Sequence, residues 1–197
     1  MPGIASLGPG TDKFGDLARH VPGSGLTVGQ VSSRHTLVLL RHAKSAYPDG
    51  VADHDRPLAP RGLREAPLAG EWLRANVSAI DLVLCSTATR ARQTLERTGV
   101  QAPVRYVERL YGATPAMVID EINGVDDDVA TLLVVGHEPT MSEVATGLAG
   151  ADGTNSAAVQ GISTKFPTSA LAVLHVAGRW KDLTPGGAAL VDFHVPR

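Results

Sequence analysis

Three short apolar segments constrain the fold of this 197-residue chain more than any other feature of its sequence. They are continuous runs rich in Leu and Val, at Thr36–Leu40, Asp81–Cys85 and Thr131–Val135. An unbroken apolar run is typical of a strand buried on both faces, whereas a half-exposed strand alternates apolar and polar residues. The chain must therefore supply helices that cover both faces of the sheet formed by these strands.

Helical patterns separate and follow the three runs. Four helices are expected, at Arg61–Val77, Thr89–Thr98, Pro115–Ile122 and Pro139–Leu148. Pro67 is expected to kink the first helix or to shift its start, because proline removes a backbone donor. Shorter strands are expected at Val104–Val107, Ala170–Val176 and Ala189–His194. Strands that alternate with helices predict a three-layer α/β/α fold with a mostly parallel central sheet.

Each apolar run is followed by side chains suited to chemistry. They are Arg41 and His42 after the first run, Ser86 and Arg90 after the second, and His137 after the third. A single Arg or His after a strand is usually a solvated loop residue. The carboxyl ends of the strands in open α/β sheets, however, are where such proteins bind ligands. The five residues together therefore predict one site at one edge of the sheet.

Two arginines and two histidines with few acidic neighbours are suited to binding an anion. Arginine makes bidentate, permanently charged contacts with phosphate oxygens. A neutral imidazole is a nucleophile toward phosphorus, and it splits a difficult hydrolysis into two easier transfers. The remaining donors stabilise charge on the other phosphate oxygens during transfer. The residues themselves therefore indicate phosphoryl transfer.

The same residues resemble the motifs of a known family. Arg41-His42-Ala43 is similar to the Arg-His-Gly/Ala signature of the histidine phosphatase (phosphoglycerate-mutase-like) superfamily. Ser86–Thr94 (STATRARQT) resembles its Ser-x-x-x-Arg-Ala-x-x-Thr segment, and Gly136-His137 resembles its second catalytic histidine. The resemblance extends over about residues 36–195, with the motifs in the same order. It implies the phosphoglycerate-mutase-like fold.

Within the superfamily, the chain is most similar to the short SixA-type phosphohistidine phosphatases. The segments that carry this similarity are Arg41–Ser45, Asp55–Leu58 and Arg61-Gly62. The resemblance implies that His42 is the nucleophile and that Arg41 and Arg90 grip the phosphate. It also implies that His137 donates to the phosphate opposite His42.

Three more residues are candidates on the same resemblance. Arg56 is either a further phosphate or substrate contact or a structural residue of its turn, and Ser45 is either a phosphate donor or a helix cap. Glu108 matches the proton-donating glutamate of larger family members. It is otherwise a surface residue paired with Arg105 or Arg109. Imidazole is a better leaving group than an alkoxide, so P–N cleavage demands less help from such an acid.

Other phosphatase chemistries fit the sequence poorly. A cysteine-based enzyme requires an arginine six positions after the cysteine, and the residue six positions after Cys85 is Ala91. Cys85 is therefore expected to be a small buried thiol. The dense cluster Asp53-His54-Asp55 lacks a second cluster that would complete a metal shell. We expect a metal-independent enzyme without a cofactor.

Two alternatives to a hydrolase stay open. A mutase returns the phosphate to a bound product and needs a site closed to water. Mutases that resemble this family carry a much longer insertion between the residues that match Arg90 and His137. A catalytically idle phosphate-binding module is the other alternative. Such a module would be expected to have lost one of the four central residues, which are Arg41, His42, Arg90 and His137. The substrate is expected to be a phosphorylated protein or a small phosphorylated metabolite.

Composition sets the remaining expectations. The net charge of −2 argues against a nucleic-acid partner. The sequence has no stretch of about 18 apolar residues, so no membrane span is expected. The single cysteine excludes an intramolecular disulfide and favours a cytoplasmic location. Residues 1–34, rich in Gly, Pro and Ser, are expected to form a poorly ordered extension before a histidine phosphatase domain at residues 35–197. Nothing in the sequence indicates the oligomeric state.

Overall fold

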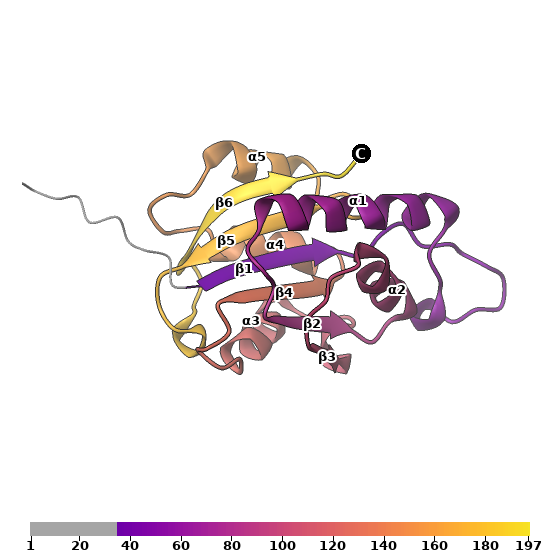
Figure 1. Cartoon of the computed structure of the whole chain (residues 1–197), viewed down its shortest axis with the longest axis horizontal. Helices are drawn as coiled ribbons and strands as arrows, with labels where there is room; N and C mark the ends of the chain where they lie inside the picture. Colours follow the sequence, from indigo (N-terminus) through magenta and orange to yellow (C-terminus); the bar gives the residue numbers. More distant parts are fainter. Residues whose placement is uncertain (1–34) are drawn as a thin grey trace, which may run out of the picture. The chain divides into compact units, whose positions relative to one another are not determined.

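Residues 35–197 are described by a computed structural model, and they contain a six-stranded sheet (Figure 1). The strands are β1 (His35–Arg41), β2 (Leu82–Ser86), β3 (Val104–Val107), β4 (Thr131–Gly136), β5 (Leu171–Val176) and β6 (Ala188–His194). All six were predicted, each within one residue at either end. The predicted extension at residues 1–34 lies outside the described residues.

The sheet is mixed, with strand order β3-β2-β4-β1-β5-β6. The four strands from β3 to β1 run parallel to their neighbours. The pairings of β5 with β1 and with β6 are antiparallel. Most of the pairings are therefore parallel, as predicted, and the antiparallel part is confined to the C-terminal strands.

Five α-helices surround the sheet in the described region. They are α1 (Pro60–Asn76), α2 (Thr89–Thr98), α3 (Pro115–Asn123), α4 (Thr140–Leu148) and α5 (Ser156–Thr164). Three short 3-10 helices also occur, namely η1 (Asp53–Asp55), η2 (Glu108–Leu110) and η3 (Trp180–Asp182). No helix in this part of the chain combines the length and the apolar character needed to cross a membrane.

Two details of the helices differ from the sequence prediction. Helix α1 begins at Pro60 and continues through Pro67, so the expected shift of its start does not occur. Helix α5 was not predicted, although its sequence carries a start signal. The Asn155 side chain accepts hydrogen bonds from the backbone N–H groups of Ala157 and Ala158, which is ordinary N-capping.

The two faces of the sheet pack against different helices. On β1, Leu37 and Leu39 belong to the core that includes α3, α4 and α5, whereas Val38 and Leu40 belong to the core that includes α1 and α2. All four side chains are fully buried. In Figure 1, α1 and α2 lie in front of the sheet, and α3 and α4 lie behind it. Burial on both faces explains why β1 is apolar without alternation.

Helices α1 and α2 approach each other closely on the front face. Gly70 of α1 faces the backbone carbonyl of Thr98 at the end of α2, and a Cβ at position 70 would overlap that oxygen. Only glycine permits this contact. The close packing fixes α2, whose first turn carries Arg90, relative to the rest of the domain.

Candidate active site

The ends of three parallel strands meet at one edge of the sheet, as the sequence predicted. Arg41 at the end of β1 is in register with Gly136 of β4, and Cys85 of β2 is in register with Val135 of β4. The loops that follow these strands therefore emerge side by side. They enclose a cavity of about 220 Å³ lined by Arg41, His42, Lys44, Ser45, Tyr47, Asp53, Arg56, Arg90, His137, Glu138 and Thr168. The four central candidates all contribute to it.

His42 has one ring nitrogen bound and the other available. Its Nδ1 lies 2.7 Å from the backbone oxygen of Ala43. A carbonyl oxygen only accepts, so Nδ1 carries the proton and Nε2 keeps its lone pair. Burial lowers the pKa of His42 to about 3, and the charges of Arg90 and Arg41 also act in that direction. The imidazole is therefore neutral near pH 7.

His137 faces His42 across the site. The two ring centroids are 5.0 Å apart, close enough for both side chains to contact one phosphate group. The Nε2 atom of His137 lies 2.8 Å from the Ser86 hydroxyl. Burial lowers the pKa of His137 to about 4, and the charge of Arg90 adds to the shift. This histidine too is neutral near pH 7.

Three buried nitrogen atoms of the site have no hydrogen-bond partner among the described residues. They are Nε of Arg41, Nε of Arg90 and Nδ1 of His137. Each arginine is held elsewhere on its guanidinium, since Arg41 donates to the backbone oxygen of Phe166 at 2.6 Å and Arg90 binds Asp53. Buried polar atoms without partners are rare in proteins, and all three belong to side chains that line the cavity.

The segment Ser86–Thr94 organises the site through residues spaced four apart. Ser86 contacts His137, Arg90 lines the cavity, and the Thr94 hydroxyl accepts a hydrogen bond from the backbone N–H of Ala43 at 2.9 Å. The same hydroxyl donates to the backbone oxygen of Arg90 at 2.6 Å. Helix α2 therefore holds the His42 loop in place while it supplies an arginine.

Comparisons with known proteins identify the family of this chain. Residues 37–112 match the model of the histidine phosphatase superfamily (branch 1). The solved structure of a SixA homologue from Nakamurella multipartitia superposes with a TM-score of 0.75 at 42% identity, over 82% of this chain and 96% of that one. This chain belongs to the histidine phosphatase superfamily.

Two sequence relatives are also informative. An uncharacterised protein of Mycobacterium tuberculosis is 70% identical over 80% of this chain and its own full length. The phosphohistidine phosphatase SixA of Escherichia coli is 32% identical over 51% of this chain and 66% of its own. With the family and the fold, these similarities support a phosphatase of the SixA-like group.

Of the three remaining candidate residues, Arg56 and Ser45 line the cavity and Glu108 does not. Arg56 lines the cavity, donates to the Ser45 hydroxyl at 3.1 Å and forms an ion pair with Asp53 at 2.6 Å. Ser45 also lines the cavity and forms a β-bridge with Leu58. The expectation that Ser45 caps a helix was wrong, because the next helical turn, η1, begins only at Asp53.

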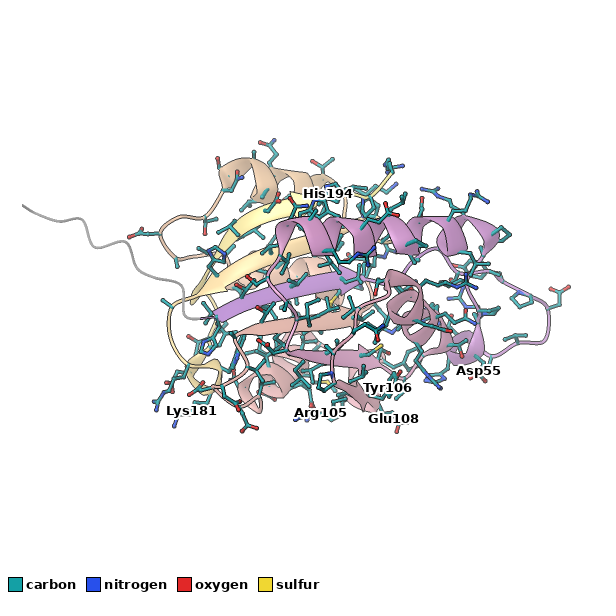
Figure 2. All side chains as sticks on the ribbon, in the orientation of Figure 1. Asp55, Arg105, Tyr106, Glu108, Lys181 and His194 are labelled. Carbon is teal, nitrogen blue, oxygen red and sulfur yellow. The ribbon has the colours of Figure 1, made fainter. Side chains whose placement is uncertain are left out.

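Glu108 lies outside the cavity. It begins η2 and is exposed, and Figure 2 shows it at the margin of the domain near Tyr106 of β3. Arg109, one of its two expected partners, pairs with Glu121 instead at 2.9 Å. The residue of this segment that does reach the site is Tyr111, whose ring centroid is 5.6 Å from that of His137.

Sequence reasoning did not assign to the site five residues of the cavity lining, namely Lys44, Tyr47, Asp53, Glu138 and Thr168, or the nearby Tyr111. The Asp53 carboxylate accepts a hydrogen bond from the Tyr111 hydroxyl at 2.8 Å. Glu138 accepts from the backbone N–H and the hydroxyl of Ser142 at the start of α4, and burial raises the pKa of its carboxyl. The signal for Glu138 was its position next to His137. The sequence marked Asp53 only as part of a possible metal cluster, and nothing in it distinguished Tyr111 from a surface residue.

The structure also bears on the rival chemistries. Cys85 is fully buried, and burial raises the pKa of its thiol to about 12, so the thiolate needed for nucleophilic attack is scarce. Within residues 35–197, the side chains of Asp53, His54 and Asp55 are not arranged as a group that could hold a metal ion. Asp53 instead binds Arg56 and Arg90.

Proposed function

We propose that this protein is a phosphatase that removes a phosphoryl group through a covalent intermediate on His42. The observation that carries the proposal is the buried neutral imidazole whose Nδ1–H is bound to Ala43, so that the lone pair of Nε2 is available in an arginine-lined cavity. The hydrogen bond fixes both the tautomer and the ring orientation before substrate arrives, and such preorganisation lowers the barrier to attack.

In the first step, Nε2 of His42 forms a bond to phosphorus as the bond to the leaving group breaks, and the leaving group keeps the bonding electron pair and takes a proton from solvent. Arg41 and Arg90 bind the oxygens of the transferring group, where charge builds up. If the Ser86 hydroxyl donates to Nε2 of His137, then Nδ1 of His137 carries the proton and offers a third donor. In the second step, water attacks phosphorus, the P–N bond breaks, and phosphate and neutral His42 are regenerated.

For the substrate, we propose a phosphohistidine side chain of a protein, ahead of a small phosphoester. Glu108, the residue expected to protonate an alkoxide leaving group, lies outside the cavity. Imidazole depends less on such a donor. The SixA homologues support the same choice, since the Escherichia coli relative is a phosphohistidine phosphatase.

A hydrolase is preferred to the alternatives for specific reasons. The segment between Arg90 and His137 contains β3, η2, α3 and β4, without the long insertion expected of a mutase. The four central residues are all present and converge, which disfavours an idle binding module. We further propose that the enzyme acts in the cytoplasm and needs no metal ion.

The function is tested with a panel of substrates. A phosphohistidine-bearing protein, phenyl phosphate and several small phosphoesters are each assayed for kcat/KM with purified protein. The proposal expects the phosphohistidine protein to give the highest value. A small phosphoester with a higher value would overturn the substrate assignment, and absence of turnover on every compound would overturn the enzymatic function.

A further inference from the structure

Asp53 places a negative charge in a cavity that is also lined by Arg41, Arg56 and Arg90. It lies in η1, within the loop that leads from β1 to α1, and it lines the same cavity as His42 and His137. A carboxylate beside a phosphate dianion is repulsive, so its presence costs binding free energy unless it serves another purpose. The contacts of Asp53 indicate what that purpose is.

The carboxylate joins three segments that are distant in sequence. Its Oδ2 accepts from Nη2 of Arg90 at 3.0 Å and from the Tyr111 hydroxyl at 2.8 Å. Its Oδ1 accepts from Nε of Arg56 at 2.9 Å. Helix α2, the residue that follows η2 and the loop itself therefore converge on one side chain. We call Asp53, Tyr111 and Arg90 the arginine clamp.

Arg90 is held at one end of its guanidinium and unbound at the other. Nη2 donates to the Asp53 carboxylate, and Nη1 donates to the backbone oxygen of Asp53 at 2.5 Å. Nε is buried and has no partner among residues 35–197. An arginine side chain loses much rotamer freedom when it is ordered. Because Arg90 is ordered before substrate binds, substrate binding does not have to oppose that loss of entropy.

We propose that Asp53 is a positioning residue that fixes the Arg90 guanidinium for phosphate binding, and that the Tyr111 hydroxyl in turn orients Asp53. The inference rests on the proposed function, since it gives Arg90 its role. It assigns a purpose to the one segment, Asp53–Asp55, that resembled a metal cluster in sequence. It also explains why Tyr111, rather than Glu108, is the residue of its segment that reaches the site.

The clamp should hold over the working pH range. The Tyr111 hydrogen bond, followed by the contacts with Arg56 and Arg90, lowers the pKa of Asp53 to about 2. The groups that face this carboxylate are Arg90, Arg56 and Tyr111, with His54 stacked edge-on against the Tyr111 ring. The carboxylate is therefore ionised near pH 7.

The test compares two aspartates of the same helical turn. Asp53→Asn removes the charge from the clamp, whereas Asp55→Asn makes the same change at an exposed residue that pairs with His54. Each variant is assayed for kcat and KM with phenyl phosphate, for tungstate affinity by calorimetry, and for its melting temperature. Tungstate is a tetrahedral dianion, so its binding reports on the phosphate site without any need for turnover.

We expect Asp53→Asn to lower kcat/KM by about ten- to a hundredfold, as expected when a charge-assisted contact is lost. Tungstate binding should weaken, while the melting temperature falls only slightly, because the carboxylate is largely exposed, and the pH profile between 6 and 9 stays unchanged. Tyr111→Phe should cause a smaller loss, and the double variant should be no worse than Asp53→Asn alone, because both residues act through Arg90. Asp55→Asn should match the wild type.

Three results would overturn the proposal. Tighter tungstate binding by Asp53→Asn would mean that the carboxylate competes with phosphate. Equal effects of Asp53→Asn and Asp55→Asn, or additive losses in the double variant, would mean that the contacts are not a clamp. If the wild type neither binds tungstate nor turns over any phosphate compound, it is the proposed function that fails.

Discussion

A buried histidine stands at each end of β1, and the two differ in how many of their ring nitrogens contact backbone oxygens. His35 begins the strand, and its ring nitrogens lie 2.8 Å from the backbone oxygen of Gly178 and 3.1 Å from that of Asp127. His42 follows the end of the strand, and a single ring nitrogen contacts a backbone oxygen. They are 2% and 7% exposed, so burial alone does not distinguish them.

The two histidines differ in whether a ring nitrogen remains without a backbone contact. Both nitrogens of His35 lie against backbone oxygens, to one of which a neutral ring donates, and the ring lies 4.7 Å from that of Trp180, so neither nitrogen opens on a cavity. His42 retains one nitrogen that opens on a cavity lined by arginines. A buried histidine with two backbone partners stabilises the fold, whereas one with a single partner is available to react.

Replacing His42 should have the largest effect on activity. His42→Ala removes the nucleophile, so kcat should fall by about 10⁴-fold or more, as for other covalent catalysts. A rapid alkaline quench during turnover of labelled substrate, followed by peptide mapping, should trap label on the wild-type peptide containing His42 and none on the variant. Label on Cys85, Ser86 or an aspartate, with the variant still active, would end the His42 assignment.

His137→Ala should reduce activity less than His42→Ala. It removes one donor to the transferring phosphoryl group, and loss of one such donor costs about 10²- to 10³-fold in kcat. Because His42 remains, the quench experiment should still trap label on its peptide. Complete loss of label in a folded variant would show that His137 is itself required for the covalent step.

At the opposite end of β1, His35→Ala should affect stability rather than chemistry. The change removes the ring N–H that donates to the backbone oxygen of Gly178 or of Asp127, and leaving a buried acceptor unpaired typically costs about 1–3 kcal/mol of the free energy of unfolding. Urea denaturation gives this value, while kcat/KM at 25 °C should stay within about twofold of wild type because the site lies at the other end of the strand. A large loss of kcat/KM without loss of stability would contradict the structural role of His35.

Acid should destabilise the fold through His42 and His137. Their folded pKa values of about 3 and about 4 lie below the ordinary 6.5, so below pH 6.5 the unfolded chain takes up protons that the folded chain does not. Stability therefore falls as the pH falls from 6.5 toward 4, by up to about 1.4 kcal/mol per pH unit for each histidine. The double variant His42→Ala/His137→Ala should show a shallower dependence in urea titrations, and an identical slope would contradict the assignment of neutral histidines.

The smallest expected effect is that of a chelator. All the phosphate contacts proposed for Arg41, His42, Arg90 and His137 are made by protein side chains, so kcat/KM should be unchanged in EDTA. The assay is repeated with added Mg²⁺, Mn²⁺ and Zn²⁺. Activity that is lost in EDTA and restored by one of these ions would return attention to Asp53 and His54 as metal ligands.

The sequence by itself determined most of the fold. Continuous apolar runs identified the strands, because only a strand buried on both faces can be apolar without alternation. The patterns between them identified four of the five described helices. Helix α5 was missed because its first residues are small and its apolar stripe is short, so tertiary contacts with α4 and β6 contribute much to its stability.

For the site, the sequence determined which residues stand at the strand ends, because register in a parallel sheet brings those ends together. It did not determine which loop residues turn inward. The placement of Asp53 in the cavity lining with Tyr111 bound to it, and of Glu108 outside the cavity, depends on contacts between segments up to 58 positions apart. Only the tertiary structure decides such contacts, since local patterns contain no information about which distant side chain a loop will meet.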